Sequence, residues 1–393
     1  MLYRRFGRTE LQMPVFSCGG MRYQHSWKDV DPTDIPQKNQ DNLEATIRRS
    51  IELGINHIET ARGYGTSELQ LGKVLPKFER DRLIIQTKVS PKADPQDFQD
   101  TVNTSLTNLQ LDYIDLLGLH GINNAETLHN SVRPGGCVDI AKQLQAEGKV
   151  RHIGFSTHGP TQVIVDAIET NLFDYINVHW YYIFQDNWPA IEAATQRDMG
   201  IFIISPSDKG GHLYSPPQRL VDLCWPLSPM VFNDLFCLSR PEVHTLSLGA
   251  AQPSDFDEHL KVLPLLDKPD EMLSPILDKL EQRAIATLGE NWYRTWQQGL
   301  PDIQSTPGNI NLSIALWLGN LIEAFDMTEY AQSRYNLLGS GGHWFPGDKA
   351  DKLSDYDLTE SLKNSPHADT IPQRLAQIHE KLGDADVKRL SQQ

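Results

Sequence analysis

The alternation of short apolar segments with longer amphipathic segments constrains the fold of this chain more than any other feature. Strands that alternate with helices form parallel βαβ units. Eight such units, without a GxGxxG motif after the first strand, favour a closed (β/α)8 TIM barrel over an open sheet. The predicted strands are Val15–Gly20, His57–Thr60, Leu83–Lys88, Tyr113–His120, Val150–Thr157, Tyr175–Tyr182, Ile201–Pro206 and Thr245–Ala251. The predicted helices are Asp41–Leu53, Glu68–Leu75, Pro95–Leu109, Gly136–Glu147, Pro160–Glu169, Trp188–Arg197 and Asp255–Leu263.

Two further regions flank the predicted barrel. Residues 2–15 indicate an N-terminal β-hairpin that caps the bottom of the barrel, with Gly7-Arg8-Thr9 as its turn. From about Lys268 the alternation stops, and apolar residues at helical spacing predict helices over Met272–Leu288 and Ile310–Phe325. We therefore expect a barrel over residues 1–267 and an all-α C-terminal extension over residues 268–393.

Composition excludes several classes of function. The 393 residues suffice for one barrel plus an appended region, and the formal net charge of −15 disfavours nucleic acid and anionic membrane surfaces as partners. The four cysteines have no zinc-site spacing, which predicts no metal site and a reducing compartment. The first twenty residues lack the long apolar stretch of a signal peptide or membrane span. A cytoplasmic protein is the expectation.

Ionisable residues stand at the ends of three successive predicted strands. Glu59 ends the second strand and is followed five residues later by Tyr64, Lys88 ends the third, and His120 ends the fourth. The carboxyl ends of parallel barrel strands meet at one end of the barrel, here called the mouth. The sequence therefore predicts that these four side chains face the same mouth.

Those four residue types suit the reduction of a carbonyl group. Tyr64 would protonate the oxygen, and the Lys88 ammonium would lower the phenol pKa from its usual value near 10. Glu59 would hold Lys88, and a neutral His120 would donate a hydrogen bond to the carbonyl oxygen. The hydride would come from a nicotinamide cofactor. Each residue alone has an ordinary structural explanation, so this prediction depends on their order, spacing and common position at strand ends.

Several motifs resemble those of the aldo-keto reductase family. NHIETARGYGTSE, LIIQTKV and YIDLLGLHG are similar to the segments in which that family carries its catalytic Asp, Tyr, Lys and His. The resemblance places these roles on Glu59, Tyr64, Lys88 and His120. RHIGFSTH, FDYINVHWYY, IFIISPSDKGG and LSLGAAQPSDFDEHL resemble its cofactor-binding segments. The resemblance implies cofactor contacts from Ser156 with Thr157 or His158 beside it, Asn177, Ser205, Ser207, Lys209, Gly210, Gly249, Ser254, Asp255 and Glu258.

The chain departs from the family pattern at three positions. Glu59 replaces Asp, which lengthens the arm that must reach Lys88. Ile204 stands where the family often has a Tyr that stacks on the nicotinamide. Asp255 stands where an Arg often meets the 2′-phosphate of NADP, and an acidic group there would repel phosphate. With Lys209 or Arg240 as compensating cations, NADP is the expected cofactor and NAD the alternative.

The extension is similar to the C-terminal, ferredoxin-like domain of aldo-keto reductases that carry an iron–sulfur cluster. At the positions of the cluster cysteines this chain has Tyr293, Trp296, Gly299 and Thr306. None of these can bind iron as thiolate does, so we expect no iron–sulfur cluster and aromatic packing in its place. The loop Gly339–Gly347, with His343 and Trp344, is interpreted either as a packed turn or as a cover over the mouth.

The expected function is an NAD(P)H-dependent oxidoreductase that reduces an aldehyde or ketone, with Tyr64 as proton donor. The alternative is a cofactor-binding regulatory or sensor subunit with little turnover. The partners expected are a small-molecule carbonyl substrate and, through the extension, a protein. Two segments would face the substrate: the polar stretch Met21–Gln40, and an aromatic run that serves equally well as barrel core. That run is Trp180, Tyr181, Tyr182 and Phe184.

Overall fold

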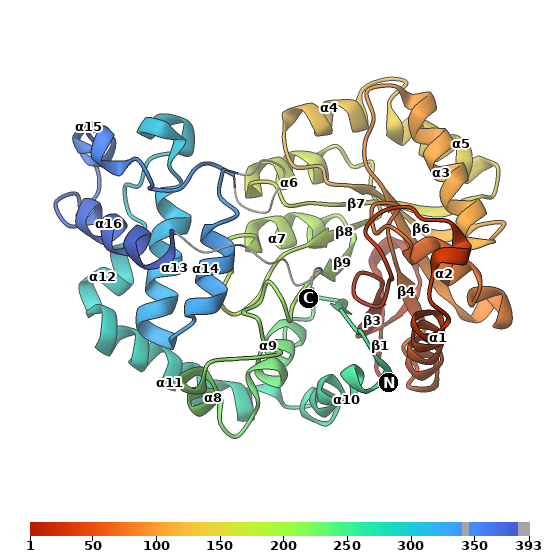
Figure 1. Ribbon diagram of the computed structural model, residues 1–393, viewed down its shortest axis with the longest axis horizontal. Coiled ribbons are helices and arrows are strands. Elements are labelled where there is room, and N and C mark those ends of the chain that lie inside the picture. The colour runs from red at the N-terminus through yellow and green to blue at the C-terminus, as the bar shows by residue number, and fades with distance from the viewer. Residues whose placement is uncertain (340–345, 384–393) are drawn as a thin grey trace. The chain divides into compact units, whose positions relative to one another are not determined.

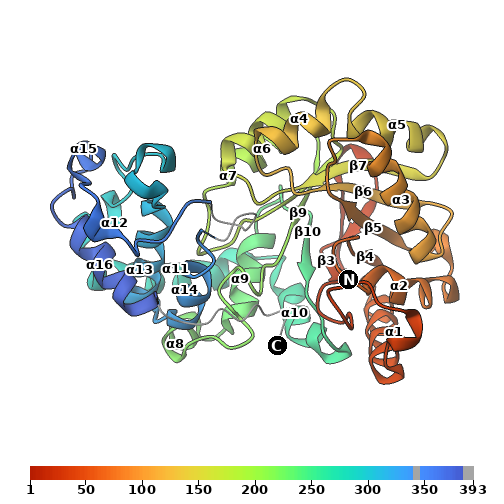
Figure 2. The ribbon, with the colours of Figure 1, turned by 45° about the horizontal axis from the view of Figure 1, so that its top comes forward.

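The computed structural model describes residues 1–339 and 346–383, which form two compact units (Figures 1 and 2). One unit comprises residues 1–210 and 233–269, and the other comprises residues 211–232 and 270–393. The predicted domain boundary at residue 267 placed residues 211–232 with the barrel, whereas in the structure they group with the second unit. This segment groups with the C-terminal helices, because Arg219 Nη1 donates to the Glu323 carbonyl at 3.4 Å and Lys279 Nζ to the Trp225 carbonyl at 2.8 Å.

The first unit is a closed barrel of eight parallel strands, as predicted. Going round the barrel, the order is β10-β3-β4-β5-β6-β7-β8-β9, so each strand follows its predecessor in the sequence and the last pairs with the first. The strands are β3 Phe16–Gly19, β4 His57–Glu59, β5 Ile84–Val89, β6 Ile114–His120, β7 Val150–Ser156, β8 Tyr175–Val178, β9 Gly200–Ile203 and β10 Thr245–Leu248.

Helices surround this barrel (Figure 1). Helix α3 shows why they form where they do: the Asp94 side chain caps its first turn by accepting from Gln96 N, and Pro95 occupies its first position. Phe98 and Val102, four residues apart, are fully buried on its inner face. The helices are α1 Gln37–Glu52, α2 Ser67–Gly72, α3 Pro95–Leu109, α4 Ala125–Val132, α5 Cys137–Ala146, α6 Thr161–Glu169, α7 Trp188–Gln196, α9 Pro229–Leu238 and α10 Phe256–His259.

The predicted N-terminal hairpin is present and closes the bottom of the barrel. Strands β1 (Tyr3–Arg5) and β2 (Gln12–Pro14) pair antiparallel across a 3₁₀ turn at Gly7–Thr9. Phe6 is completely buried in a cluster with Ile84 and Tyr175, the first residues of β5 and β8, and with Phe202 of β9. The bottom is thus filled by apolar side chains, which leaves the opposite end, the mouth, for chemistry.

The strand register brings the predicted site residues to the mouth. Lys88 pairs with Gly118, His120 with Ser156, and Ser156 with Asn177. A Cβ atom at Gly118 would lie 2.9 Å from Lys88 Cγ, so this glycine leaves the space that the lysine side chain occupies.

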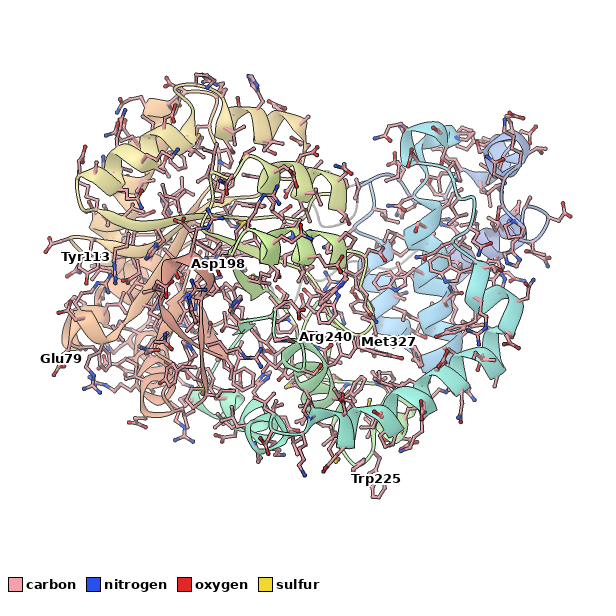
Figure 3. All side chains as sticks on the ribbon, turned by 180° about the vertical axis from the view of Figure 1, so that it is seen from behind. Glu79, Tyr113, Asp198, Trp225, Arg240 and Met327 are labelled. Atoms are coloured by element: carbon pink, nitrogen blue, oxygen red, sulfur yellow. The ribbon has the colours of Figure 1, made fainter. Side chains whose placement is uncertain are left out.

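The second unit is helical in its described part, which confirms the predicted all-α extension. Helix α13 is its buried centre and packs against α14 and α16. Trp225, in the loop after α8, is 70% exposed (Figure 3). The helices are α8 Gln218–Cys224, α11 Pro269–Leu288, α12 Glu290–Thr295, α13 Leu312–Phe325, α14 Thr328–Tyr335, α15 Thr359–Leu362 and α16 Ile371–Leu382.

Candidate active site

A buried ion pair joins the ends of β4 and β5. Glu59 and Lys88 are only 4% and 2% exposed, and the Lys88 ammonium donates to Glu59 Oε2. The same ammonium donates to the Thr60 carbonyl at 2.8 Å, and Ser247 Oγ donates to Glu59 Oε1 at 2.9 Å. The longer arm of Glu59 therefore reaches both partners, and each charge is matched within the barrel.

Tyr64 lies in the loop between β4 and α2, beside this pair. Lys88 Nζ is 5.1 Å from the centre of the Tyr64 ring, and the His120 ring meets the phenol edge to face at 5.8 Å. Gly65 holds the loop in place, with a φ of +52° that disfavours other residues. The structure thus brings together all four residues that the sequence predicts to be catalytic.

The ionisation of Tyr64 differs from the expectation. Burial, and secondly the charge of Glu59, raise the pKa of the Tyr64 phenol well above its usual value, whereas the sequence suggested that Lys88 would lower it. The physical reason is that the Lys88 ammonium is already paired with Glu59, so the pair presents little net positive charge to the phenol. Tyr64 is therefore a protonated phenol at neutral pH.

His120 is neutral, as the predicted hydrogen-bond donor should be. Burial, and secondly the positive charges of Lys88 and Lys209, lower the pKa of the His120 imidazole to about 3. The Tyr64 hydroxyl and the His120 imidazole are thus two neutral donors beside one another, which suits them to a substrate oxygen that gains negative charge.

Ser156 and Asn177 occupy neighbouring positions at the ends of β7 and β8. The Ser156 Oγ accepts from Gly121 N at 3.2 Å. Asn177 is fully buried, and within the described chain neither its Nδ2 nor its Oδ1 has a hydrogen-bond partner. Unpartnered buried amide atoms are costly unless a ligand satisfies them. One donor and one acceptor on Asn177 fit the carboxamide of a nicotinamide, which the resemblance places here.

The loop after β9 carries the predicted phosphate-binding residues. Ser205 has a left-handed φ of 55°, and the buried Ser207 Oγ has no hydrogen-bond partner in the described structure. A Cβ atom at Gly210 would lie 1.9 Å from the Pro206 carbonyl oxygen, so only glycine fits. Lys209 lies close to two imidazoles, with Nζ 3.3 Å from His158 Nδ1 and 3.2 Å from His179 Nε2. The loop thus combines a cation with a buried donor, as a phosphate site requires.

A chain of hydrogen bonds beside Lys209 was not predicted. The Tyr181 hydroxyl donates to the Ile204 carbonyl, so its oxygen accepts from His179 Nδ1 at 2.5 Å. In a neutral His179 the other nitrogen, Nε2, then accepts from His158 Nδ1 at 2.6 Å. The signal was the spacing of His179, two residues after Asn177, because alternate strand residues share a face.

The stretch after β10 places the remaining predicted cofactor residues on the mouth side of that strand. The Arg22 guanidinium donates to the Gly249 carbonyl at 2.7 Å and lies 3.8 Å from the Asp255 carboxylate. Ser254 is exposed, and Glu258 forms an ion pair with Lys261.

Arg240, which the sequence offered as a compensating cation, precedes β10 and therefore lies at the end of the barrel where the strands begin, opposite the mouth. Its carbonyl accepts from Arg4 Nη1 of the hairpin at 3.1 Å. Arg240 therefore takes no part in the mouth.

The two predicted substrate-side segments have different positions. Trp180 is buried, with its ring stacked on Phe236 at 4.9 Å, and Tyr181 is fully buried, so both belong to the barrel wall. The Met21–Gln40 segment, whose last four residues begin α1, lies against the loop that carries Tyr64: the centre of the Trp27 ring is 6.1 Å from that of the Tyr64 ring. Of these two segments, Met21–Gln40 is therefore the one that reaches Tyr64.

Residues 1–339 and 346–383 contain no group of three or more His, Cys, Asp or Glu side chains that could hold a metal ion. The four cysteines are buried and free. No helix in those residues has the length and apolar character needed to cross a bilayer. Most of the predicted loop Gly339–Gly347, including His343 and Trp344, lies outside the described residues.

Comparison with known proteins identifies the family that this chain resembles. Residues 16–211, about half of the chain, match the model of the aldo/keto reductase family. Over 138 residues the chain is 32% identical to aldo-keto reductase family 4 member C11 of Arabidopsis thaliana, covering 31% of this chain and 43% of that protein. Over 180 residues it is 30% identical to L-galactose dehydrogenase of the same plant, covering 43% of this chain and 55% of that protein. The chain thus spans about half the length of these curated relatives.

Solved structures share the fold at low sequence identity. The holo form of an aldo-keto reductase from Bacillus halodurans superposes with a TM-score of 0.59 at 20% identity, covering 71% of this chain and 96% of that one. An aldo-keto reductase from Klebsiella pneumoniae in complex with NADPH has a TM-score of 0.54 at 19% identity, covering 70% and 95%. The resemblance of the extension to the iron–sulfur subfamily stays a prediction. From its barrel and the family match, the chain belongs to the aldo/keto reductase family.

Proposed function

We propose that this protein is an NAD(P)H-dependent oxidoreductase that reduces an aldehyde or ketone to an alcohol. The observation that carries the proposal is the meeting of Tyr64, His120 and the Glu59–Lys88 pair at the ends of three successive strands. Next to them, on β8, the buried amide of Asn177 has no hydrogen-bond partner among the described residues. Family membership supports the same class of reaction.

Tyr64 is the proposed proton donor. The raised phenol pKa keeps the proton on Tyr64 at rest, and hydride transfer turns the carbonyl oxygen of the substrate into a strongly basic alkoxide that can accept this proton. His120 holds the carbonyl oxygen by donating a hydrogen bond, and remains neutral while it does so. The Lys88 ammonium, 5.1 Å from the centre of the ring, lies beside the phenolate that Tyr64 becomes, with its charge largely balanced by Glu59.

A nicotinamide cofactor, when bound, supplies the hydride. Ser156 and Asn177 are proposed to hold the carboxamide, and the β9 loop and the stretch after β10 to hold the rest of the cofactor. The resemblance favours NADP and leaves NAD as the alternative. The proposed cofactor contacts are Ser156, Asn177, Ser205, Ser207, Lys209, Gly210, Gly249, Ser254, Asp255 and Glu258.

The test is the Tyr64→Phe variant, which removes one hydroxyl and keeps the ring between Trp27 and His120. We expect kcat for a panel of small aldehydes and ketones to fall by about 10²–10⁴-fold, the usual contribution of general acid catalysis. Cofactor affinity, measured by calorimetric titration, should stay near that of the native protein. Tyr113→Phe is the matched control, because that hydroxyl contacts only Asp81 at the barrel surface (Figure 3).

The outcomes separate the two candidate functions. Native turnover in Tyr64→Phe would remove Tyr64 as the donor. Tight cofactor binding by the native protein, with no carbonyl in the panel reduced, would favour the regulatory or sensor subunit instead. A protein partner for the extension and a cytoplasmic location stay predictions.

A further inference from the structure

We infer, on the basis of the proposed function, that the cofactor site is built for NAD(H) rather than NADP(H), with Asp255 as the residue that discriminates. Nicotinamide cofactors differ only at the 2′ position of the adenosine ribose, which is a hydroxyl in NAD and a phosphate in NADP. The charges around that position therefore decide the preference.

Barrel topology indicates which strand end receives the adenosine. In (β/α)8 barrels, phosphate groups commonly bind the loops after the seventh and eighth strands, which are β9 and β10 here. The strands β7, β8, β9 and β10 are consecutive neighbours around the barrel. Asn177 on β8 and Ser207 after β9 carry buried polar atoms that have no hydrogen-bond partner in the described part of the chain. A dinucleotide held at its nicotinamide end by β7 and β8 and at its phosphates by the β9 loop brings its adenosine to the stretch after β10.

The carboxylate of Asp255 lies in that stretch. Asp255 Oδ2 accepts a hydrogen bond from Ala251 N at 2.8 Å, and in the described structure its Oδ1 accepts none. The side chain is 18% exposed, so it is partly shielded from water but remains accessible. A ribose 2′-hydroxyl can donate to such a carboxylate, as the acidic residue of NAD-binding sites does in dinucleotide-binding folds.

The nearby cations are already engaged by carboxylates. Arg22 lies 3.8 Å from Asp255 while it donates to the Gly249 carbonyl. Arg49 pairs with Asp257 at 3.1 Å, and Lys261 pairs with Glu258. A 2′-phosphate at this position would lie against the Asp255 carboxylate, where like charges repel. The Asp255 carboxylate thus favours the cofactor without the extra phosphate.

The experiment measures dissociation constants for NADH and NADPH on the full chain by isothermal titration calorimetry, without substrate. We expect NADH to bind more tightly by about tenfold or more. Asp255→Asn keeps the shape and the acceptor for Ala251 N but removes the charge, so the preference should shrink to within about threefold. Asp257→Asn is the matched control: it removes the same charge from the same stretch, at a side chain that faces Arg49, and the ratio should not change.

Each outcome decides the inference. NADPH binding as tightly as NADH to the native protein overturns the assignment while leaving the proposed reductase intact. A loss of preference as large in Asp257→Asn as in Asp255→Asn overturns Asp255 as the discriminating residue. If neither NADH nor NADPH binds the native protein, the proposed function is overturned, and this inference with it.

Discussion

Replacing Glu59 with Gln should destabilise the barrel more than most substitutions on its surface. The change keeps the side-chain shape and the acceptor for Ser247. The Lys88 ammonium, which is only 2% exposed, then keeps the Thr60 carbonyl as its one remaining partner among the described residues. Breaking a buried ion pair from one side costs about 3–5 kcal/mol, because an uncompensated charge remains out of water. That is a large part of the roughly 5–15 kcal/mol by which a domain is stable.

A double-mutant cycle separates the pair from its parts. Lys88→Met removes the cation and should cost about as much as Glu59→Gln, since Glu59 then keeps only Ser247. The combined variant Glu59→Gln/Lys88→Met carries neither charge, so it should be no less stable than the worse single variant. The two effects would therefore fail to add by roughly 3 kcal/mol, at the upper end of measured couplings.

The assay must report on the barrel alone, because the chain has two units and a global transition need not be two-state. Hydrogen exchange of peptides that cover β4 and β5, followed by mass spectrometry, gives the local opening free energy in the full chain. Glu10→Gln is the control, since Glu10 pairs with Arg5 at the exposed hairpin, where water screens the charges. Additive losses in the cycle, or a loss below about 1 kcal/mol in Glu59→Gln, would refute a buried, mutually dependent pair.

Three further predictions follow from burial and backbone geometry. Burial, together with the charge of Lys88, lowers the pKa of His57 to about 3. On acidification the unfolded chain therefore binds a proton at His57 before the folded chain does, so the stability of the folded state falls as the pH drops below about 6.5. His57→Gln should reduce that acid slope by about 1.4 kcal/mol per pH unit between about pH 6 and 4, measured by exchange protection at several pH values; an unchanged slope would contradict a neutral His57. Gly65→Ala places a Cβ atom 1.9 Å from a backbone oxygen and should lower kcat/KM by about 10²-fold through displacement of Tyr64. A Cβ atom at Gly63 would lie 4.0 Å from the His120 ring, an ordinary van der Waals contact, so Gly63→Ala should be tolerated; equal effects would argue against a fixed loop. Trp180→Ala empties a buried site and should cost about 3–5 kcal/mol of barrel stability by exchange protection, and a loss under about 1 kcal/mol would place its ring outside the core.

Much of the fold and part of the site followed from local sequence patterns. Segments such as Ile84–Val89 and Ile114–His120 are rich in Ile, Leu and Val, because both faces of a parallel barrel strand are buried. Their last residues therefore had to meet at one end, which put Lys88 and His120 together before any coordinates were known. The hairpin and the helical extension were predictable for the same reason, that turn residues and apolar spacing act over short distances.

Other features depend on residues that are distant in the sequence. Arg22 and Asp255 lie 233 positions apart and meet only because β10 closes the barrel against β3. The grouping of residues 211–232 with the C-terminal helices likewise follows from contacts such as Lys279 with Trp225, which no local pattern records.

The sequence by itself determined which chemical groups stand at the strand ends and in what order. Only the tertiary structure decided the ionisation of Tyr64: burial, and secondly the charge of Glu59, raise the pKa of its phenol, so Tyr64 keeps its proton more tightly than a phenol in water instead of less. The physical reason is that a pKa depends on burial and on every charge nearby, and neither quantity is a property of a single segment.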